Sequence, residues 1–372
     1  MTASRIAMTR RVGSVVPSSP EPELVKYAEH PRTPSKGPAP ADRRAVTDTL
    51  SDVLRAVRLT GAVFFAIDAS NPWVTEAPHA SDIAPHIMPG VEHVIEYHVV
   101  KTGSCWGGLV GEPAIQLEAG DIIVFPQGDS HVISSAPGMR ATLDLTPHER
   151  ASRSPLPVAI SIDGGGSERV QLICGFLGCD ARPFNPLLAT LPRVIHLRGN
   201  GEDGSVLRNL VELAVAESST PKAGTDCILS RLSELLFIEV VRRYVAALPS
   251  GTGGWFAGLR DEQIGRALQK LHQRPAHPWN LEELAKEVGM SRSMLAERFT
   301  HFVGVPPIQY LAQWRIQLAA GLLRSNSSGL AEIAERVGYG SEAALSRAFK
   351  RWVGVAPALY RRAGSDSGSG FR

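Results

Sequence analysis

Side chains that can hydrogen-bond to DNA bases occur in two similar segments near the C-terminal end of the sequence. Glu297 lies in the first segment, SRSMLAERFTHFVG, and Arg347 lies in the second, SEAALSRAFKRWVG. An arginine can donate two hydrogen bonds to guanine O6 and N7, and a glutamate can accept one from cytosine N4. If these segments are helices that fit the major groove, their polar side chains are suited to reading a base sequence.

The two segments belong to an internal repeat. Residues 281–311 align with residues 330–360, at an offset of 49 residues in the first part and 50 in the second. Each copy has a short segment of helical period, a turn that contains Gly, and a longer second helical segment, which is the pattern of a helix-turn-helix unit. A purely structural helical repeat would explain the apolar positions but not the polar face.

The second helix of each copy is predicted to have one apolar and one polar face. At about 100° per residue, Leu295 and Phe299 point inward in the first copy, as Leu345 and Phe349 do in the second. The opposite face and the helix starts supply base and phosphate contacts, with Arg298 and Arg315 as further phosphate candidates. The predicted DNA-binding residues are Ser291, Arg292, Ser293, Ala296, Glu297, Thr300, Ser341, Glu342, Ala343, Ser346, Arg347, Lys350 and Arg351.

The segments LAKEVGMSRSMLAERF, GVPPIQYLAQWRIQLAAGLL and IAERVGYGSEAALSRAFKRWVGVAPALYRR resemble the DNA-binding domain of AraC-type transcription regulators. The resemblance implies two helix-turn-helix units joined by a long helix near residues 307–324, which places two recognition helices in successive major grooves. It also implies promoter or operator DNA as a partner, with RNA polymerase as a further partner of an activator. Ala296 and Ala343 replace larger polar residues of the family, so base reading is expected to depend on Arg347, Glu297 and backbone positioning.

Residues from about 60 to 185 consist of short β-branched runs such as AVFFAI, HVIEYHVV and DIIVFP, punctuated by Gly, Pro and Asp. Many short strands without intervening helices predict a sandwich or a small barrel. The spacing G-x5-P-x-G-x2-H-x3 from Gly120 to Ser135 resembles the second conserved motif of cupins. The resemblance implies a cupin-like β-barrel with a small-molecule effector pocket, to which we assign His98, Trp106 and His131.

Metal-dependent cupins hold their cation with an H-x-H pair, a Glu and a later His. Here Val100 stands two residues after His98, and Ser135 replaces the usual Asn. We therefore predict no metal, no cofactor and no enzymatic activity. Two alternatives stay open: a cupin enzyme with a helical appendage, and a DNA-binding protein without an effector. Whether small molecules change operator affinity would decide the second.

Composition agrees with a globular protein of two domains or so. The 372 residues are 43% hydrophobic and 20% charged. The formal net charge of +2 divides into −4 over residues 1–259 and +6 over residues 260–362, and a basic C-terminal third is typical of a nucleic-acid module. No run of about 18 apolar residues and no secretory signal occurs, so we expect a cytoplasmic protein without a membrane partner.

We predict an α+β protein in which a cupin-like β-barrel with trailing helices precedes an all-α domain of two helix-turn-helix units. The predicted parts are a disordered arm at 1–44, a cupin-like effector-sensing and dimerisation domain at 45–248, a linker at 249–258, the DNA-binding domain at 259–364 and a disordered tail at 365–372. Leu229, Leu232, Leu236 and Val240 recur at the spacing of a helix pair, which favours a homodimer contact along residues 225–247. Burial of this stripe against the barrel would produce the same pattern.

Overall fold

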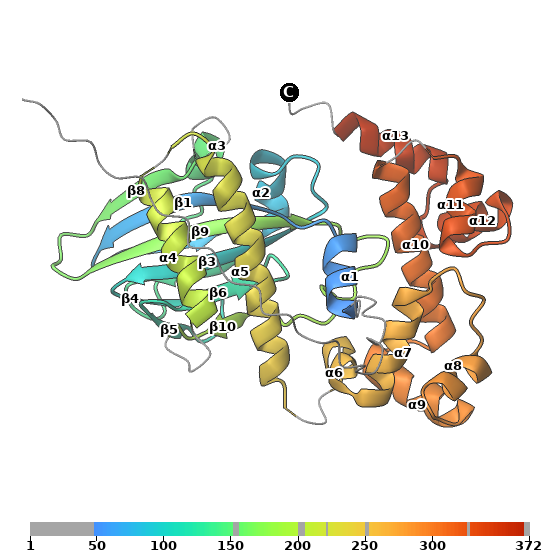
Figure 1. Cartoon of the computed structure of the whole chain (residues 1–372). Helices are drawn as coiled ribbons and strands as arrows, with labels where there is room; N and C mark the ends of the chain where they lie inside the picture. The colour runs from blue at the N-terminus through green and yellow to red at the C-terminus, as the bar shows by residue number, and fades with distance from the viewer. Residues whose placement is uncertain are drawn as a thin grey trace, which may run out of the picture. The chain divides into compact units, whose positions relative to one another are not determined.

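A computed structural model of the chain describes residues 48–151, 156–199, 205–220, 222–249, 253–325 and 328–367 (Figure 1). The predicted arm at 1–44 lies outside the described residues, as do residues 368–372 of the predicted tail. Strands dominate the first half of the described chain and helices the second, which confirms the predicted α+β class.

Two β-sheets form the N-terminal domain. The larger sheet has the strand order β10-β6-β3-β9-β1-β8, and the smaller has the order β2-β7-β4-β5. The strands are β1 (Thr60–Ser70), β2 (Val74–Ala77), β3 (His93–Thr102), β4 (Ser104–Leu109), β5 (Ile115–Glu118), β6 (Ile122–Phe125), β7 (His131–Ser134), β8 (Val158–Asp163), β9 (Arg169–Cys179) and β10 (Ile195–Leu197). The described strands form two open sheets and not the closed barrel that the sequence predicts, because their apolar faces pack together while their edges do not pair.

Strand β3 shows how the larger sheet separates two cores. Side chains alternate between the two faces of a strand. Ile95, Tyr97 and Val99 belong to the apolar cluster under the trailing helices. Glu96 and His98 therefore point to the opposite face, into the space between the two sheets. The sequence HVIEYHVV thus directs two ionisable side chains into the interior of the domain.

Helices α4 (Ser205–Ser219) and α5 (Thr225–Ala247) lie across the outer face of the larger sheet (Figure 1). The stripe predicted as a dimer contact is buried there, since Leu229, Leu232, Leu236 and Val240 are 1% to 4% exposed and share a cluster with Tyr97. The assignment of this stripe to a dimer contact is wrong, because the helix uses it to cover its own sheet.

The approach of α5 to the sheet depends on a glycine and a hydrogen bond. A Cβ atom at Gly61 in β1 would lie 2.5 Å from Cβ of Ser233, so only glycine allows the helix this close. The hydroxyls of Tyr97 and Ser233 are 2.6 Å apart and hydrogen-bond across the same contact. Three shorter helices complete the domain: α1 (Thr49–Ala56), α2 (Ala80–Ile87) and α3 (Thr146–Ala151).

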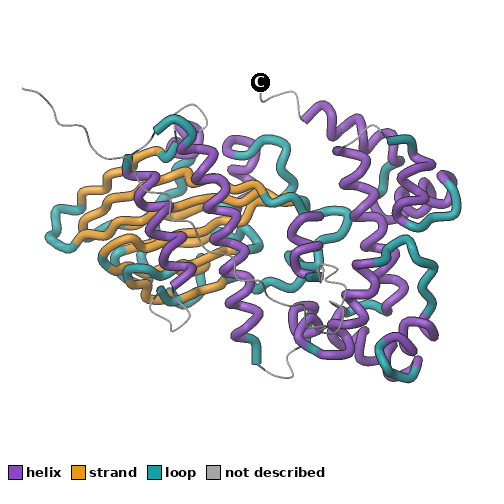
Figure 2. Tube along the Cα trace, in the orientation of Figure 1, coloured by secondary structure: helices purple, strands orange, loops and turns teal. Residues whose placement is uncertain are grey.

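The described elements that follow α5 are all helices (Figure 2). They are α6 (Trp255–Arg260), α7 (Glu262–Gln273), α8 (Leu281–Glu287), α9 (Arg292–Val303), α10 (Pro307–Ser325), α11 (Leu330–Val337), α12 (Glu342–Val353) and α13 (Pro357–Ser367). Helix α6 begins inside the predicted linker, with Trp255 and Phe256 buried, and α13 continues past the predicted domain end at residue 364. No helix in the described ranges is both long and apolar enough to cross a membrane.

Helix α10 takes part in the cores of both helix-turn-helix units. Its residues Tyr310 and Trp314 pack in the same cluster as Leu295 and Phe299 of α9. Further along the helix, Ile316, Ala319, Ala320 and Leu323 pack in a separate cluster with Leu345 and Phe349 of α12. One continuous helix therefore fixes the two units relative to each other.

Candidate nucleic-acid interface and effector cavity

Helices α9 and α12 begin and end at residues that the sequence marks. The hydroxyl of Ser291 accepts a hydrogen bond from the Met294 amide at 3.3 Å, and Ser341 accepts one from the Ala344 amide at 3.2 Å. Such caps satisfy amides that have no partner within the helix. Both helices end at a glycine in the left-handed region, Gly304 with φ 81° and Gly354 with φ 86°.

The outer faces of α9 and α12 are polar, as the helical period predicts. Leu295, Phe299, Leu345 and Phe349 are each 0% exposed. Two predicted DNA-binding residues, Ala296 and Ser346, are half-buried. The exposed ones are Ser291, Arg292, Ser293, Glu297, Thr300, Ser341, Glu342, Ala343, Arg347, Lys350 and Arg351.

Two further arginines that the sequence offers for phosphate contact are already bound within the protein. Arg298 forms an ion pair of 2.6 Å with Asp261 and donates to Gln263 Oε1 at 2.8 Å. Arg315 donates to the backbone carbonyls of Pro275 at 2.7 Å and of His277 at 2.8 Å. These two guanidinium groups hold the helices together.

Met294 is an exposed residue of α9 that the sequence prediction missed. Its side chain is 49% exposed on the first turn of the helix. A methionine is usually taken as a core residue, but Leu295 next to it occupies the inward position. The helical period of the sequence already indicated that Met294 is exposed, because adjacent residues of a helix point about 100° apart and Leu295 faces inward.

A cavity of about 300 Å³ lies in the N-terminal domain, and its lining combines apolar and ionisable residues. Phe65, Ile67, Ile133 and Phe176 contribute to its apolar part. The lining also includes Glu96, His98, His131, His148 and Cys174. The volume lies at the lower end of the usual range for small-molecule sites.

His98 and His131 both line the cavity, whereas Trp106 is not among its lining residues. Trp106 occupies the next position of β4 after Cys105, which is 1% exposed and packs between the sheets. Since side chains alternate along the strand, Trp106 points to the other face. The expectation that Trp106 lines the pocket is therefore wrong.

The two histidines form a hydrogen-bonded chain with Cys174. His131 Nδ1 donates to the Asp129 carbonyl at 2.9 Å, which leaves its Nε2 as an acceptor. His98 Nε2 lies 2.7 Å from His131 Nε2 and donates to it, so His98 Nδ1 accepts from the Cys174 thiol at 2.9 Å. Burial lowers the pKa of both histidines, that of His131 to about 4, and raises the pKa of the thiol. The chain is neutral and each of its members has a partner.

Glu96 is the ionisable residue of the cavity that the sequence prediction missed. It is 2% exposed, and its Oε2 lies 3.8 Å from His131 Nε2. Within the described part of the chain its other oxygen, Oε1, has no hydrogen-bond partner, and neither has Nδ1 of His148. Burial raises the pKa of Glu96 well above its usual value. The sequence feature that could have identified Glu96 is the alternation of side chains along residues 93–102, which places a glutamate at an inward position of the strand.

The described residues contain no group of three or more His, Cys, Asp or Glu side chains that could hold a metal ion. His98 and His131 point their Nε2 atoms at each other at 2.7 Å, and His98 Nδ1 is bound by Cys174.

The domain that holds the cavity and the domain that holds α9 and α12 each match known proteins, and together they match one family. A cupin family model matches residues 48–246, and a helix-turn-helix domain model matches residues 284–363. An AraC-like transcription regulator of Streptomyces antibioticus is 33% identical over 322 residues, which cover 85% of this chain and 98% of that protein. The chain belongs to the AraC-like transcription regulators.

A further curated relative and a solved structure are also similar to the chain. The HTH-type transcriptional regulator AlkR of Acinetobacter baylyi is 28% identical over 317 residues, covering 85% of this chain and 99% of that protein. The DNA-binding domain of the global transcriptional factor AdpA, solved in complex with a target DNA, is 28% identical over 30% of this chain and 99% of that domain, with a TM-score of 0.29. By its family models and its curated relatives, this AraC-type protein is a DNA-binding transcription regulator with a cupin-like N-terminal domain.

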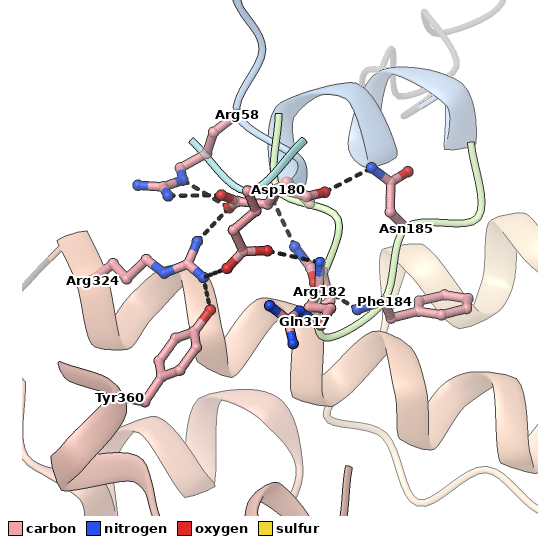
Figure 3. A network of polar contacts seen from close by, with 10 residues as sticks. Arg58, Asp180, Arg182, Phe184, Asn185, Gln317, Arg324 and Tyr360 are labelled. Carbon is pink, nitrogen blue, oxygen red and sulfur yellow. Dashed lines mark hydrogen bonds and ion pairs between the residues drawn. The ribbon is translucent and has the colours of Figure 1, made fainter. Parts of the chain in front are cut away.

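In this AraC-type regulator, α10 of the DNA-binding domain is bound to the cupin-like domain through an ion-pair network (Figure 3). Arg324 pairs with Asp180 at 2.7 Å and with Glu92 at 2.8 Å, and it lies against the ring of Tyr360. Arg58 donates two hydrogen bonds of 2.8 Å to the carboxylate of Asp180. The Arg324 and Asp180 side chains are only 10% and 8% exposed. We call these five residues the interdomain network.

A second contact on α10 strengthens the connection. Gln317, 1% exposed, accepts a hydrogen bond from the Phe184 amide and donates one to the Ala56 carbonyl, both at 3.0 Å. The side chain of Gln317 therefore links α10 to α1 and to the loop after β9. A buried amide with both of its polar atoms bound is specific for this arrangement of the chain.

Proposed function

We propose that this AraC-type regulator reads promoter DNA with α9 and α12 and that a small molecule in its cupin-like domain regulates it. The observation that supports the DNA interface is the pair of capped helices with exposed polar faces, held by the shared helix α10. Arg347 and Glu297 are exposed at the centres of these faces and are proposed to read bases. The flanking Arg351 and Lys350 supply phosphate contact and hence affinity.

Met294 adds an apolar group to the proposed interface. Its thioether side chain is exposed at the start of α9, where the N-terminal residues of a recognition helix contact base edges. Apolar side chains contact the C5-methyl group of thymine in the major groove. We therefore assign Met294 a contact with thymine rather than a role in the core.

The effector response is proposed to use strands β3 and β9. Glu96 and His98 of β3 and Cys174 of β9 line the cavity, and the two strands pair directly along their length. Glu92 comes just before β3, and Asp180 comes just after β9. Both strands thus carry cavity residues, and each is flanked by a residue that binds Arg324. A shift of these strands when a ligand binds therefore changes the contact between the cupin-like domain and α10 of the DNA-binding domain.

The cavity is proposed to bind and not to catalyse. The Cys174 thiol donates to His98 and its pKa is raised by burial, so it is a weak nucleophile. Burial lowers the pKa of His98 and of His131, which makes both imidazoles weak bases. The relatives in the comparison are transcription regulators. Among the described residues that line the cavity, Cys174 is thus not an activated nucleophile, which supports binding rather than catalysis.

We propose a homodimer through the outer faces of α4 and α5. Val206 and Leu213 of α4 are each 51% exposed, and Ile228 and Leu235 of α5 are 43% and 49% exposed. Each pair is seven residues apart, which places its members on one side of a helix. A second copy of the chain covers this apolar surface and brings four helix-turn-helix units to one operator, with a gain in avidity. If the regulator activates transcription, RNA polymerase is its further partner, and the site of action is the cytoplasm.

Footprinting of the full-length protein on genomic DNA, followed by binding titrations at several salt concentrations, tests the DNA interface. Because phosphate contacts release counterions, affinity should fall steeply with salt. The double change Arg347→Glu and Lys350→Glu on α12 should abolish binding. A matched change in charge on the cupin-like domain, away from α4 and α5, serves as the control: Arg55→Glu and Arg169→Glu replace two exposed arginines and should leave binding intact. Equal losses in both variants would contradict the assignment of the interface to α12.

A further inference from the structure

The cavity of the cupin-like domain holds a carboxyl group that the protein itself does not satisfy. Glu96 lies on β3 between the sheets and is 2% exposed. Its Oε1 has no hydrogen-bond partner among the described residues, and it lines the cavity. An unsatisfied buried polar atom is costly, and native proteins usually give it a partner. The cavity next to Glu96 has room for a ligand that supplies one.

The charges around the cavity restrict the chemistry of that ligand. Glu76, Glu96 and Asp144 contribute carboxyl groups to the described lining, which includes no lysine and no arginine. Arg140 neutralises Glu76 through bonds of 2.6 and 2.8 Å, but no such partner reaches Glu96. The described lining therefore offers an anionic ligand no lysine or arginine to compensate its charge, which is unfavourable at low dielectric constant.

The other residues that line the cavity are suited to contact an apolar part of a ligand. Phe65 and Phe176 lie edge to face at 6.3 Å between ring centroids, and Ile67 and Ile133 extend the same surface. The lining also includes the exposed residues Thr142 and Asp144, so the cavity reaches the surface of the domain there. A small aromatic or aliphatic group can enter and be covered by these side chains.

We propose that the cavity binds a small hydrophobic amine, whose ammonium group pairs with Glu96 and whose apolar body packs on Phe65 and Phe176. This proposal rests on the proposed effector function of the same cavity. His148 Nδ1, which also lines the cavity and has no partner among the described residues, accepts a second hydrogen bond from the ammonium group. Both unsatisfied atoms are acceptors for a ligand with several N–H donors.

Binding of the amine includes the transfer of a proton to solvent. Because burial keeps the pKa of Glu96 high, the free cavity holds this residue as the neutral acid. The ammonium ion enters with its charge, Glu96 loses its proton, and an ion pair forms with the net release of about one proton to the buffer. A neutral ligand of the same shape would leave Glu96 protonated and release none.

Isothermal titration calorimetry of the full-length protein tests the ligand class with three matched probes. They are 2-phenylethylamine, 2-phenylethanol and 3-phenylpropanoate, which present an ammonium, a hydroxyl and a carboxylate on similar bodies. The amine should bind at least about tenfold more tightly than the alcohol, since charge-assisted hydrogen bonds are stronger than neutral ones. The carboxylate should bind least tightly. Titrations of the amine in phosphate and in Tris buffer should differ in enthalpy because of the released proton.

Three variants make the result specific. Glu96→Gln keeps the size of the side chain and removes its charge, so the amine should bind no better than the alcohol. The control Glu118→Gln changes an exposed glutamate of β5 and should leave all affinities unchanged. Ile160→Trp fills the cavity from the half-buried strand β8 and should abolish binding of every probe even if Glu96→Gln proves unstable. Equal affinity for amine and alcohol, or tighter binding of the carboxylate, would overturn the proposal.

Operator affinity measured with and without the amine separates the ligand class from the effector role. Amine binding that leaves operator affinity unchanged would support the ligand class and refute the effector function. Failure of the amine to bind, while another probe both binds and changes operator affinity, would refute the ligand class and support the effector function.

Discussion

Replacement of Asp180 by alanine should weaken the attachment of α10 to the cupin-like domain. In the native chain this carboxylate accepts two hydrogen bonds of 2.8 Å from Arg58 and pairs with Arg324 at 2.7 Å. The Arg324 side chain is 10% exposed, so the loss of Asp180 leaves its charge largely out of water. Glu92 would remain as its only carboxylate partner in the network.

The expected loss in the free energy of unfolding depends on how much charge remains buried without a partner. Removal of one partner of a buried ion pair costs about 3–5 kcal/mol in the free energy of unfolding. Arg58 is 52% exposed and returns to water, and Glu92 still pairs with Arg324 at 2.8 Å, so both contacts reduce the loss. We therefore expect a loss at the lower end, about 3 kcal/mol.

Urea unfolding of the single variants Asp180→Ala and Arg324→Met and of the double variant measures this contact. The coupling free energy of the cycle should be about 1–3 kcal/mol. Glu234→Ala, which breaks the pair with the exposed Arg231, is the control and should change stability less than Asp180→Ala does. A coupling below about 0.5 kcal/mol would show that the network does not hold the two domains together.

Three further predictions concern the DNA-binding domain and the helices of the cupin-like domain. Arg347→Ala should cost about 1–3 kcal/mol at one base position of the operator, seen in titrations against substituted operators, whereas Lys350→Ala should weaken binding to all of them equally. Burial lowers the pKa of His272 from 6.5 to about 3, so the unfolded chain binds this proton more readily and stability falls as pH falls below about 6.5. From pH 8 to pH 5 its contribution to the free energy of unfolding should drop by about 2 kcal/mol, and His272→Phe should remove that part of the pH dependence in urea unfolding. In sedimentation equilibrium, Leu235→Glu should yield a folded monomer and Leu232→Glu an unfolded chain; a folded dimer in both variants would refute the proposed dimer surface.

The sequence by itself determined the helix-turn-helix units, because the information for them is local. The apolar period that buries Phe299 and Phe349 extends over a few turns of helix, and the caps Ser291 and Ser341 act on amides three residues away. The two copies also repeat these signals at nearly constant spacing. The outward positions of Glu297 and Arg347 follow from the same period, since whatever is not buried in a two-sided helix faces outward.

The cupin-like domain could be predicted only in part, because its sheet positions depend on pairing between distant strands. The motif spacing identified His131, and the structure places it 2.7 Å from His98 in the cavity. The alternation of β3 already contained the inward position of Glu96, but its significance arises only when β9 and the smaller sheet enclose it. Trp106 could not be assigned to the correct face until the register of β4 was known.

Only the tertiary structure decided which surfaces meet. The stripe on α5 is equally suited to a partner helix and to a sheet, and Tyr97, more than a hundred positions earlier, fills the space beneath it. Arg324 is an ordinary basic residue at the end of a helix, and nothing near it in the sequence indicates that Glu92, 232 positions away, is its partner. Such contacts join segments that lie far apart in the sequence at no regular spacing. Local sequence patterns therefore cannot encode them, and only the packed fold determines them.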